Sequence, residues 1–116
     1  MEDDFTMRSL LQTLLELEGF EVLAFEGGSG QFIEKCAEFN PHFILIDYHL
    51  KIGSGLELLS QLRANYRQPS PRVLMLSGED HRNQCLKAGA DGFILKPFMP
   101  DELIGWLHER EKSLEF

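Results

Sequence analysis

Apolar residues follow two alternating patterns along the chain, short continuous runs and stripes at helical spacing. Short runs between turn residues are typical of strands buried on both faces, whereas stripes at helical spacing are typical of amphipathic helices. On this basis we expect helices at 4–19, 32–39, 55–66, 79–89 and 100–114. We expect strands at 20–25, 42–47, 73–77 and 92–96.

The order of these elements indicates the fold class. Strands that alternate with helices favour a parallel sheet covered by helices on both faces and joined by right-handed crossovers. We therefore predict one doubly wound α/β domain spanning residues 1–116, because a chain of 116 residues has room for a single core. In such domains ligands bind beyond the carboxyl ends of the strands.

Composition narrows the choice of partners. The 19 acidic and 11 basic residues give a net charge of −8, which opposes direct binding to nucleic acid. No apolar run approaches the roughly 20 residues that a membrane span needs, so we expect no membrane association and a cytoplasmic location. Cys36 and Cys85 lack the spacing of metal ligands and are interpreted as structural thiols.

Polar residues stand at the ends of three predicted strands. Asp47, Ser77 and Lys96 each end a strand, while Glu2 and Asp3 precede the first helix. An aspartate at a strand end is by itself more often a turn former or helix cap than a nucleophile. Together, however, these groups suit phosphoryl chemistry. Clustered carboxylates need a divalent cation such as Mg²⁺, and an ammonium and a hydroxyl can stabilise phosphoryl oxygens.

Four motifs give the chain its resemblance to the receiver domains of two-component response regulators. They are "EDDFTMR", "ILIDYHLKIGSGLELL", "VLMLSG" and "GADGFILKPF". The resemblance implies a flavodoxin-like sheet with strand order 2-1-3-4-5, in which the acidic pair follows the central first strand. Only Met1 precedes Glu2, so we expect this strand to be truncated or absent from the given sequence. We expect strand-forming residues upstream, or else an exchanged segment or a rearranged sheet.

The resemblance also implies a magnesium site. Asp3, Asp47 and the main-chain carbonyl of His49 would bind Mg²⁺, and Glu2 would act through a metal-bound water. The imidazole of His49 is expected in solvent. Lys51 stands where many members of the family carry proline. This difference puts the rigidity of the loop in question and leaves the phosphoryl chemistry unaffected.

The phosphoryl site follows from the same resemblance. Asp47 is the implied phosphoacceptor, Ser77 would hydrogen-bond a phosphoryl oxygen, and Lys96 would pair with the phosphate. The peptide bond between Lys96 and Pro97 is expected to be cis. Phe93 stands at the position of the family's switch aromatic, acting with Ser77, although simple packing on the last strand explains it equally well.

The expected function is therefore a phosphorylation switch without separate substrate turnover. Phosphate would come from a histidine kinase or a phosphotransfer protein, and activation would change a partner or homodimer surface near Phe93 and Trp106. Core packing is the competing interpretation of Trp106. Two alternative functions stay open, a degenerate receiver acting only as an interaction module and an Asp-nucleophile phosphohydrolase. The hydrolase would want a second acid where this chain has His49, and a substrate cap.

The remaining histidines offer no metal motif in the sequence. His42, His81 and His108 have no partners at ligand spacing, so we expect them to be surface residues.

Overall fold

The computed structural model describes residues 4–25, 32–50, 54–65 and 71–111. Its elements follow the predicted order, and their bounds are α1 Phe5–Leu17, α2 Phe32–Phe39, β1 Phe43–Asp47, α3 Gly55–Asn65, β2 Arg72–Ser77, α4 Arg82–Lys87, β3 Gly92–Leu95 and α5 Pro100–Glu111. Asp4 caps α1 by accepting a hydrogen bond from the amide of Met7. Gly19 follows the end of that helix with a φ of 93°, a conformation that glycine adopts without steric cost.

The sheet is parallel throughout the described residues. Its strand order is β1-β2-β3, with Asp47 beside Leu76 and Ser77 beside Leu95. The carboxyl ends of all three strands therefore lie at one edge, because parallel strands run in the same direction. These strands are the third, fourth and fifth of the expected order.

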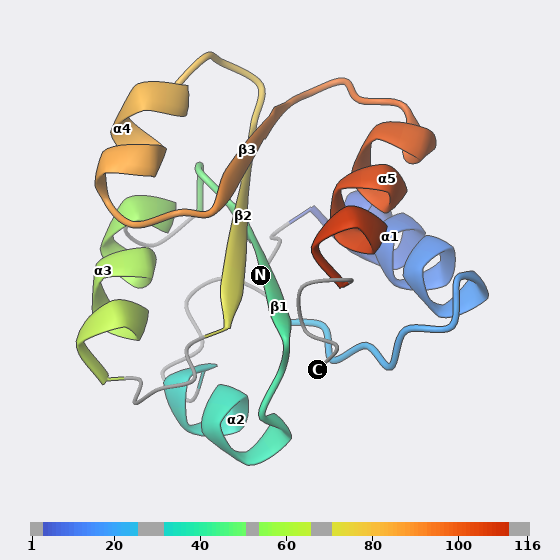
Figure 1. The fold of residues 1–116 in the computed structure, drawn as a ribbon, viewed down its shortest axis with the longest axis horizontal. Helices are drawn as coiled ribbons and strands as arrows, with labels where there is room; N and C mark the ends of the chain where they lie inside the picture. Colours follow the sequence, from blue (N-terminus) through green and yellow to red (C-terminus); the bar gives the residue numbers. More distant parts are fainter. Residues whose placement is uncertain (1–3, 26–31, 51–53, 66–70, 112–116) are drawn as a thin grey trace.

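Helices cover both faces of the sheet (Figure 1). Side chains of β2 alternate between the two faces, Val73 and Met75 toward α3 and α4, and Leu74 and Leu76 toward α1 and α5. All four are essentially inaccessible to solvent. Burial on both faces explains why the sequence of β2 is one continuous apolar run. The helices on both faces confirm the predicted doubly wound class.

The strand predicted at 20–25 is wrong. The described segment has no strand pairing, and it borders a cavity of about 370 Å³ that is also lined by Phe43, Ile44 and Leu45 of β1. A strand forms only where another backbone lies about 4.8 Å away to share a ladder. No described strand lies between this segment and β1. Any strand before Glu2 falls outside the described residues.

The helix predicted at 79–89 is shorter than expected. Its α-helical part is Arg82–Lys87, because Glu79 and Asp80 belong to the preceding loop. The Asp80 carboxylate accepts a hydrogen bond from the amide of Arg82, a local bond that competes with helix formation. No helix among the described residues is both long and apolar enough to cross a membrane.

Candidate functional site

Asp47 is the last residue of β1 and is 8% exposed. The amide of the following Tyr48 donates a 2.7 Å hydrogen bond to the carbonyl of Leu76 and so continues the pairing with β2. This ladder fixes the backbone of Asp47 at the carboxyl edge of the sheet. Its Oδ1 accepts a hydrogen bond from the amide of His49 at 3.3 Å.

Lys96 and Asp47 meet across the ends of the sheet. The Nζ atom of Lys96 lies 3.3 Å from Oδ2 of Asp47. The amide of Lys96 also donates to the carbonyl of Ser77 at 2.7 Å, which fixes the start of its side chain just beyond β3. The peptide bond between Lys96 and Pro97 is cis, the isomer expected from the sequence.

Ser77 ends the central strand and is fully buried. Its Oγ accepts a 3.1 Å hydrogen bond from the amide of Glu79. Since β2 lies between β1 and β3, Ser77 stands between the strand ends that carry Asp47 and Lys96. These three groups thus occupy one edge, whereas Glu2 and Asp3 lie outside the described residues.

Gly55, the first residue of α3, packs directly against the backbone of Asp47. A Cβ atom at Gly55 would collide with the carbonyl oxygen of Asp47, and it would lie 2.9 Å from Cε of Met75 and 3.0 Å from Cα of Tyr48. The amide of Gly55 donates to the carbonyl of Tyr48 at 2.9 Å. Only glycine allows this close approach between the start of α3 and the end of β1.

Phe93 lies inside the molecule. It is 5% exposed and belongs to the core formed with α2, α3 and α4. The guanidinium of Arg82 lies over its ring, 5.4 Å from the centroid. The described conformation therefore has the aromatic side chain turned inward. Trp106 is partly buried against Gly92 and Phe43, as core packing predicts.

The expectation that His81 is a surface residue without partners is wrong. Its side chain is 21% exposed, and its ring stacks on Tyr48 with centroids 3.9 Å apart. His49 and Glu79 contribute donor atoms nearby, so that the three potential ligand atoms all lie within 4.8 Å of one another. Sequence spacing could not reveal this cluster, because His49 comes from a different loop. The imidazole of His49 is 60% exposed, in line with its expected position in solvent.

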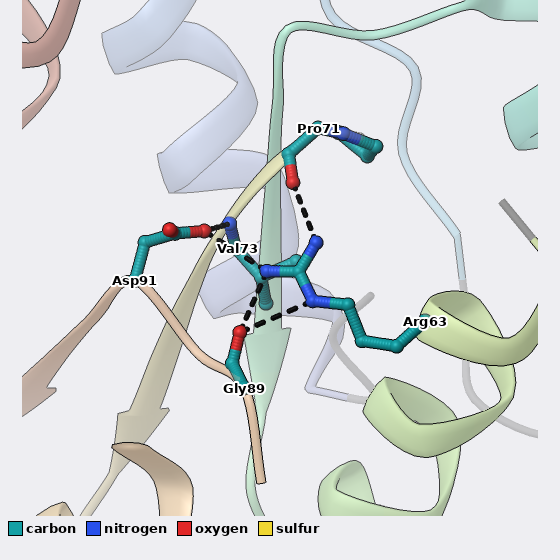
Figure 2. A network of polar contacts seen from close by, with 5 residues as sticks. All are labelled: Arg63, Pro71, Val73, Gly89 and Asp91. Carbon is teal, nitrogen blue, oxygen red and sulfur yellow. Dashed lines mark hydrogen bonds and ion pairs between the residues drawn. The ribbon is translucent and has the colours of Figure 1, made fainter. Parts of the chain in front are cut away.

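A polar network at the opposite end of the strands was not foreseen (Figure 2). Arg63 of α3 donates to the carbonyls of Gly89 and Pro71 and to the carboxylate of Asp91. The same Asp91 oxygen accepts the amide of Val73 at 2.7 Å. The network joins α3 to the starts of β2 and β3, and its role is structural. The sequence around Arg63 gives no indication of these partners, because most of them lie far away along the chain.

The two cysteines match their predicted role. Cys36 is 5% exposed and Cys85 is fully buried, and neither forms a disulfide. Burial raises the pKa of the Cys36 thiol to about 11 and also raises the pKa of Cys85. Both thiols are therefore protonated at neutral pH and poorly nucleophilic.

Comparison with known proteins gives a family assignment for most of the chain. The family model described as "Response regulator receiver domain" matches residues 1–108. The phosphate regulon transcriptional regulatory protein PhoB of Pseudomonas aeruginosa is 33% identical over 110 residues, which are 92% of this chain and 48% of PhoB. The chain thus spans about half the length of that relative. The chemotaxis protein CheY of Listeria monocytogenes is 29% identical over 115 residues, 97% of this chain and 95% of CheY.

Solved structures agree with the fold. The signal receiver domain of a response regulator from Bermanella marisrubri superposes with a TM-score of 0.83 at 28% identity, covering 93% of this chain and 91% of that one. A TM-score of this size over most of the chain shows a shared fold.

Proposed function

The chain belongs to the response regulator receiver domain family, and from this premise we propose that Asp47 accepts a phosphoryl group from a histidine kinase or a phosphotransfer protein. Receiver domains generally interact with such donors in two-component systems and do not turn over a separate substrate. Phosphoaspartate and Mg²⁺ are typical of the family. The proposed phosphoacceptor domain is the whole of residues 1–116.

The pairing of Asp47 with Lys96 is the observation that carries this proposal. The ammonium lies 3.3 Å from the carboxylate that would act as the nucleophile. The same ammonium can afterwards pair with a phosphoryl group attached to the carboxylate. A purely structural ion pair would not require the neighbouring strand to end in a buried hydroxyl, which Ser77 supplies.

The reaction is an in-line phosphoryl transfer. One carboxylate oxygen of Asp47 forms the new bond to phosphorus while the bond to the donor breaks, and the donor atom leaves with the electron pair. The product is an acyl phosphate on Asp47. Lys96 then balances charge on a phosphoryl oxygen, and the hydroxyl of Ser77 donates to another.

The residues present fit a magnesium ion. The Asp47 carboxylate and the carbonyl of His49 are hard oxygen donors of the kind that Mg²⁺ prefers, and Asp47 ends its strand with the amide of His49 folded back onto Oδ1. Asp3 would add a further carboxylate, and Glu2 would act through water. When bound, the cation supplies charge neutralisation on the phosphoryl oxygens.

The switch surface is proposed on α4, β3 and α5. Ser77 would leave the amide of Glu79 to bind the phosphoryl group, and Phe93 would adjust its packing in the space beside it. Exposed apolar side chains on these elements and the loop after β3 support a partner surface, since Leu86 is 43%, Leu95 44% and Met99 71% exposed. Light scattering with and without beryllium fluoride tests whether this partner is a second copy. An unchanged monomer would leave only heterologous partners.

The proposed acceptor is tested by incubating the protein with acetyl phosphate and Mg²⁺ and measuring its intact mass. We expect the mass of one added phosphoryl group, lost in Asp47→Asn and kept in the control Asp80→Asn, whose carboxylate is exposed in a nearby loop. Labelling of Asp47→Asn at the wild-type rate would refute the assignment. Sustained release of phosphate from a separate ester would favour the phosphohydrolase, and absence of labelling would favour the interaction module.

A further inference from the structure

A cluster of three metal-binding side chains lies beside the phosphoacceptor edge. The cluster consists of His49 from the loop after β1 and of Glu79 and His81 from the loop after β2. The Nε2 atom of His49 lies 3.9 Å from Oε1 of Glu79, and Nε2 of His81 lies 3.8 Å from Oε2 of the same carboxylate. Both imidazoles therefore present the same ring nitrogen to one carboxylate.

His81 is held in place by its neighbours. Its ring stacks on Tyr48 at an interplanar angle of 7°, and the hydroxyl of Tyr48 donates to the side-chain carbonyl of Gln84 at 3.1 Å. The Nε2 atom of His81 is buried and makes no hydrogen bond within the described part of the chain. A buried ring nitrogen without a hydrogen bond is costly unless something binds it.

The donors suit a transition metal better than Mg²⁺. Two imidazoles and one carboxylate are the ligand set of open zinc sites, in which water fills the fourth position. Ligands at about 2.0–2.1 Å in a tetrahedron are about 3.4 Å apart. The three donor atoms lie within 4.8 Å of one another, so the side chains must approach by at most about 1.4 Å to reach that spacing. The side chains of His49 and Glu79 are 60% and 73% exposed, which leaves them room to turn.

From this geometry we propose that His49, Glu79 and His81 form a binding site for Zn²⁺ or a chemically similar divalent ion. The site is distinct from the proposed magnesium site, which uses the carbonyl of His49 and not its imidazole. The three ligands belong to the two loops that follow β1 and β2. An ion bound there would add a direct link between these two loops, which already meet where Tyr48 stacks on His81.

Metal binding would act directly on the phosphoryl site. His49 and Glu79 each lie two residues beyond a site residue, and their amides hydrogen-bond to Asp47 and to Oγ of Ser77. An ion that joins the two loops would hold Ser77 on the amide of Glu79 and slow its transfer to a phosphoryl group. This consequence rests on the proposed function, whereas the binding itself does not.

Binding is tested by calorimetric titration of the full chain with Zn²⁺ in the presence of excess Mg²⁺. We expect one ion per chain, with affinity reduced at least about tenfold in both His49→Ala and His81→Ala, since loss of a direct ligand costs no less than loss of an outer-shell partner. His42→Ala is the matched control, because it removes an exposed imidazole from outside the cluster. Its affinity should equal that of the wild type.

Several outcomes would overturn the site. Unchanged Zn²⁺ affinity in His49→Ala, equal loss in His42→Ala, or displacement of Zn²⁺ by Mg²⁺ would each place the ion elsewhere. If His81→Ala fails to fold because the stack on Tyr48 is lost, Glu79→Gln and His49→Ala still decide, since both side chains are mostly exposed. For the consequence, Zn²⁺ should slow labelling by acetyl phosphate several-fold in the wild type and not in Glu79→Gln. Binding without this slowing would refute only the regulatory step.

Discussion

The ammonium of Lys96 lies 3.3 Å from the carboxylate of Asp47, with side-chain exposures of 19% and 11%. Because the Lys96 ammonium would pair with the phosphoryl group and not with the cation, Lys96→Ala should weaken phosphoryl transfer without weakening Mg²⁺ binding. We expect labelling by acetyl phosphate to slow about 100- to 1,000-fold, as when one charge-stabilising donor is removed. The exposed Lys87→Ala is the control. A parallel loss of Mg²⁺ affinity, measured by titration, would contradict the role given to Lys96.

Arg63 should be a major contributor to stability. Its guanidinium reaches two carbonyls and the carboxylate of Asp91, at 2.7–3.1 Å. Arg63→Ala would leave the partly buried Asp91 with a single amide donor, and we expect the free energy of unfolding to fall by about 2–3 kcal/mol. Arg63→Lys should recover little of the lost stability, since a lysine ammonium lacks the planar, forked set of donors of the guanidinium.

Chemical denaturation measures this loss, with Lys35→Ala as the matched control. Lys35 forms an exposed pair with Glu38 at 3.6 Å, and such pairs contribute about 0–1 kcal/mol. Equal effects of the Arg63 and Lys35 substitutions would mean that the network shown in Figure 2 contributes no more than a surface ion pair.

Two glycine substitutions should have opposite effects. Gly55→Ala places a methyl group against the carbonyl of Asp47 and within 3.0 Å of Tyr48, so we expect a loss of about 1–3 kcal/mol from overpacking together with slower labelling of Asp47. Gly105→Ala adds a methyl group in α5 where nothing lies within 4 Å, and it should stabilise the protein by about 0.5–1 kcal/mol. Thermal melting compares the two. A Gly55→Ala protein as stable as the wild type would show that this close approach relaxes easily.

The spacing of apolar residues predicted most of the helices and strands, because most of them bury a complete apolar stripe or a continuous apolar run. The apolar run before Asp47 is such a case, since both of its faces are covered and no polar residue interrupts it. The segment at 20–25 is also mostly apolar but forms no strand, because strand formation also depends on a neighbouring backbone. Apolar sequence alone does not report whether that neighbour is there.

The site was predictable for a geometric reason. Parallel strands bring their carboxyl ends to one edge, so that Asp47, Ser77 and Lys96 become neighbours whatever the loops do. Contacts between loops do not follow from such a rule. The cluster of His49 with Glu79 and His81 depends on how two loops fold over the strand ends, and a single sequence carries no period or spacing that records it.

His108 should make stability depend on pH. Its ring nitrogens lie 2.9 Å from the carboxylate of Glu111 and 3.4 Å from that of Glu18. A hydrogen bond to Glu111, the larger cause, and a second one to Glu18 raise the pKa of His108 above the ordinary value of 6.5. The folded protein therefore holds this proton more tightly than the unfolded chain does. The resulting stabilisation is fully present below the unfolded pKa and is lost as the pH rises through the folded pKa.

Comparing the melting temperatures of the wild type and His108→Gln across pH isolates this effect. We expect the wild type to exceed the variant by more at about pH 5.5 than at about pH 8.5, because the charged imidazole is more populated at the lower value. His42→Gln removes an exposed histidine and should show no such trend. Added salt should shrink the difference at low pH, since these groups are exposed and their attraction is screened. A difference that stays constant with pH and salt would show that His108 acts through its contact with the ring of Phe20, 5.8 Å away, and not through its charge.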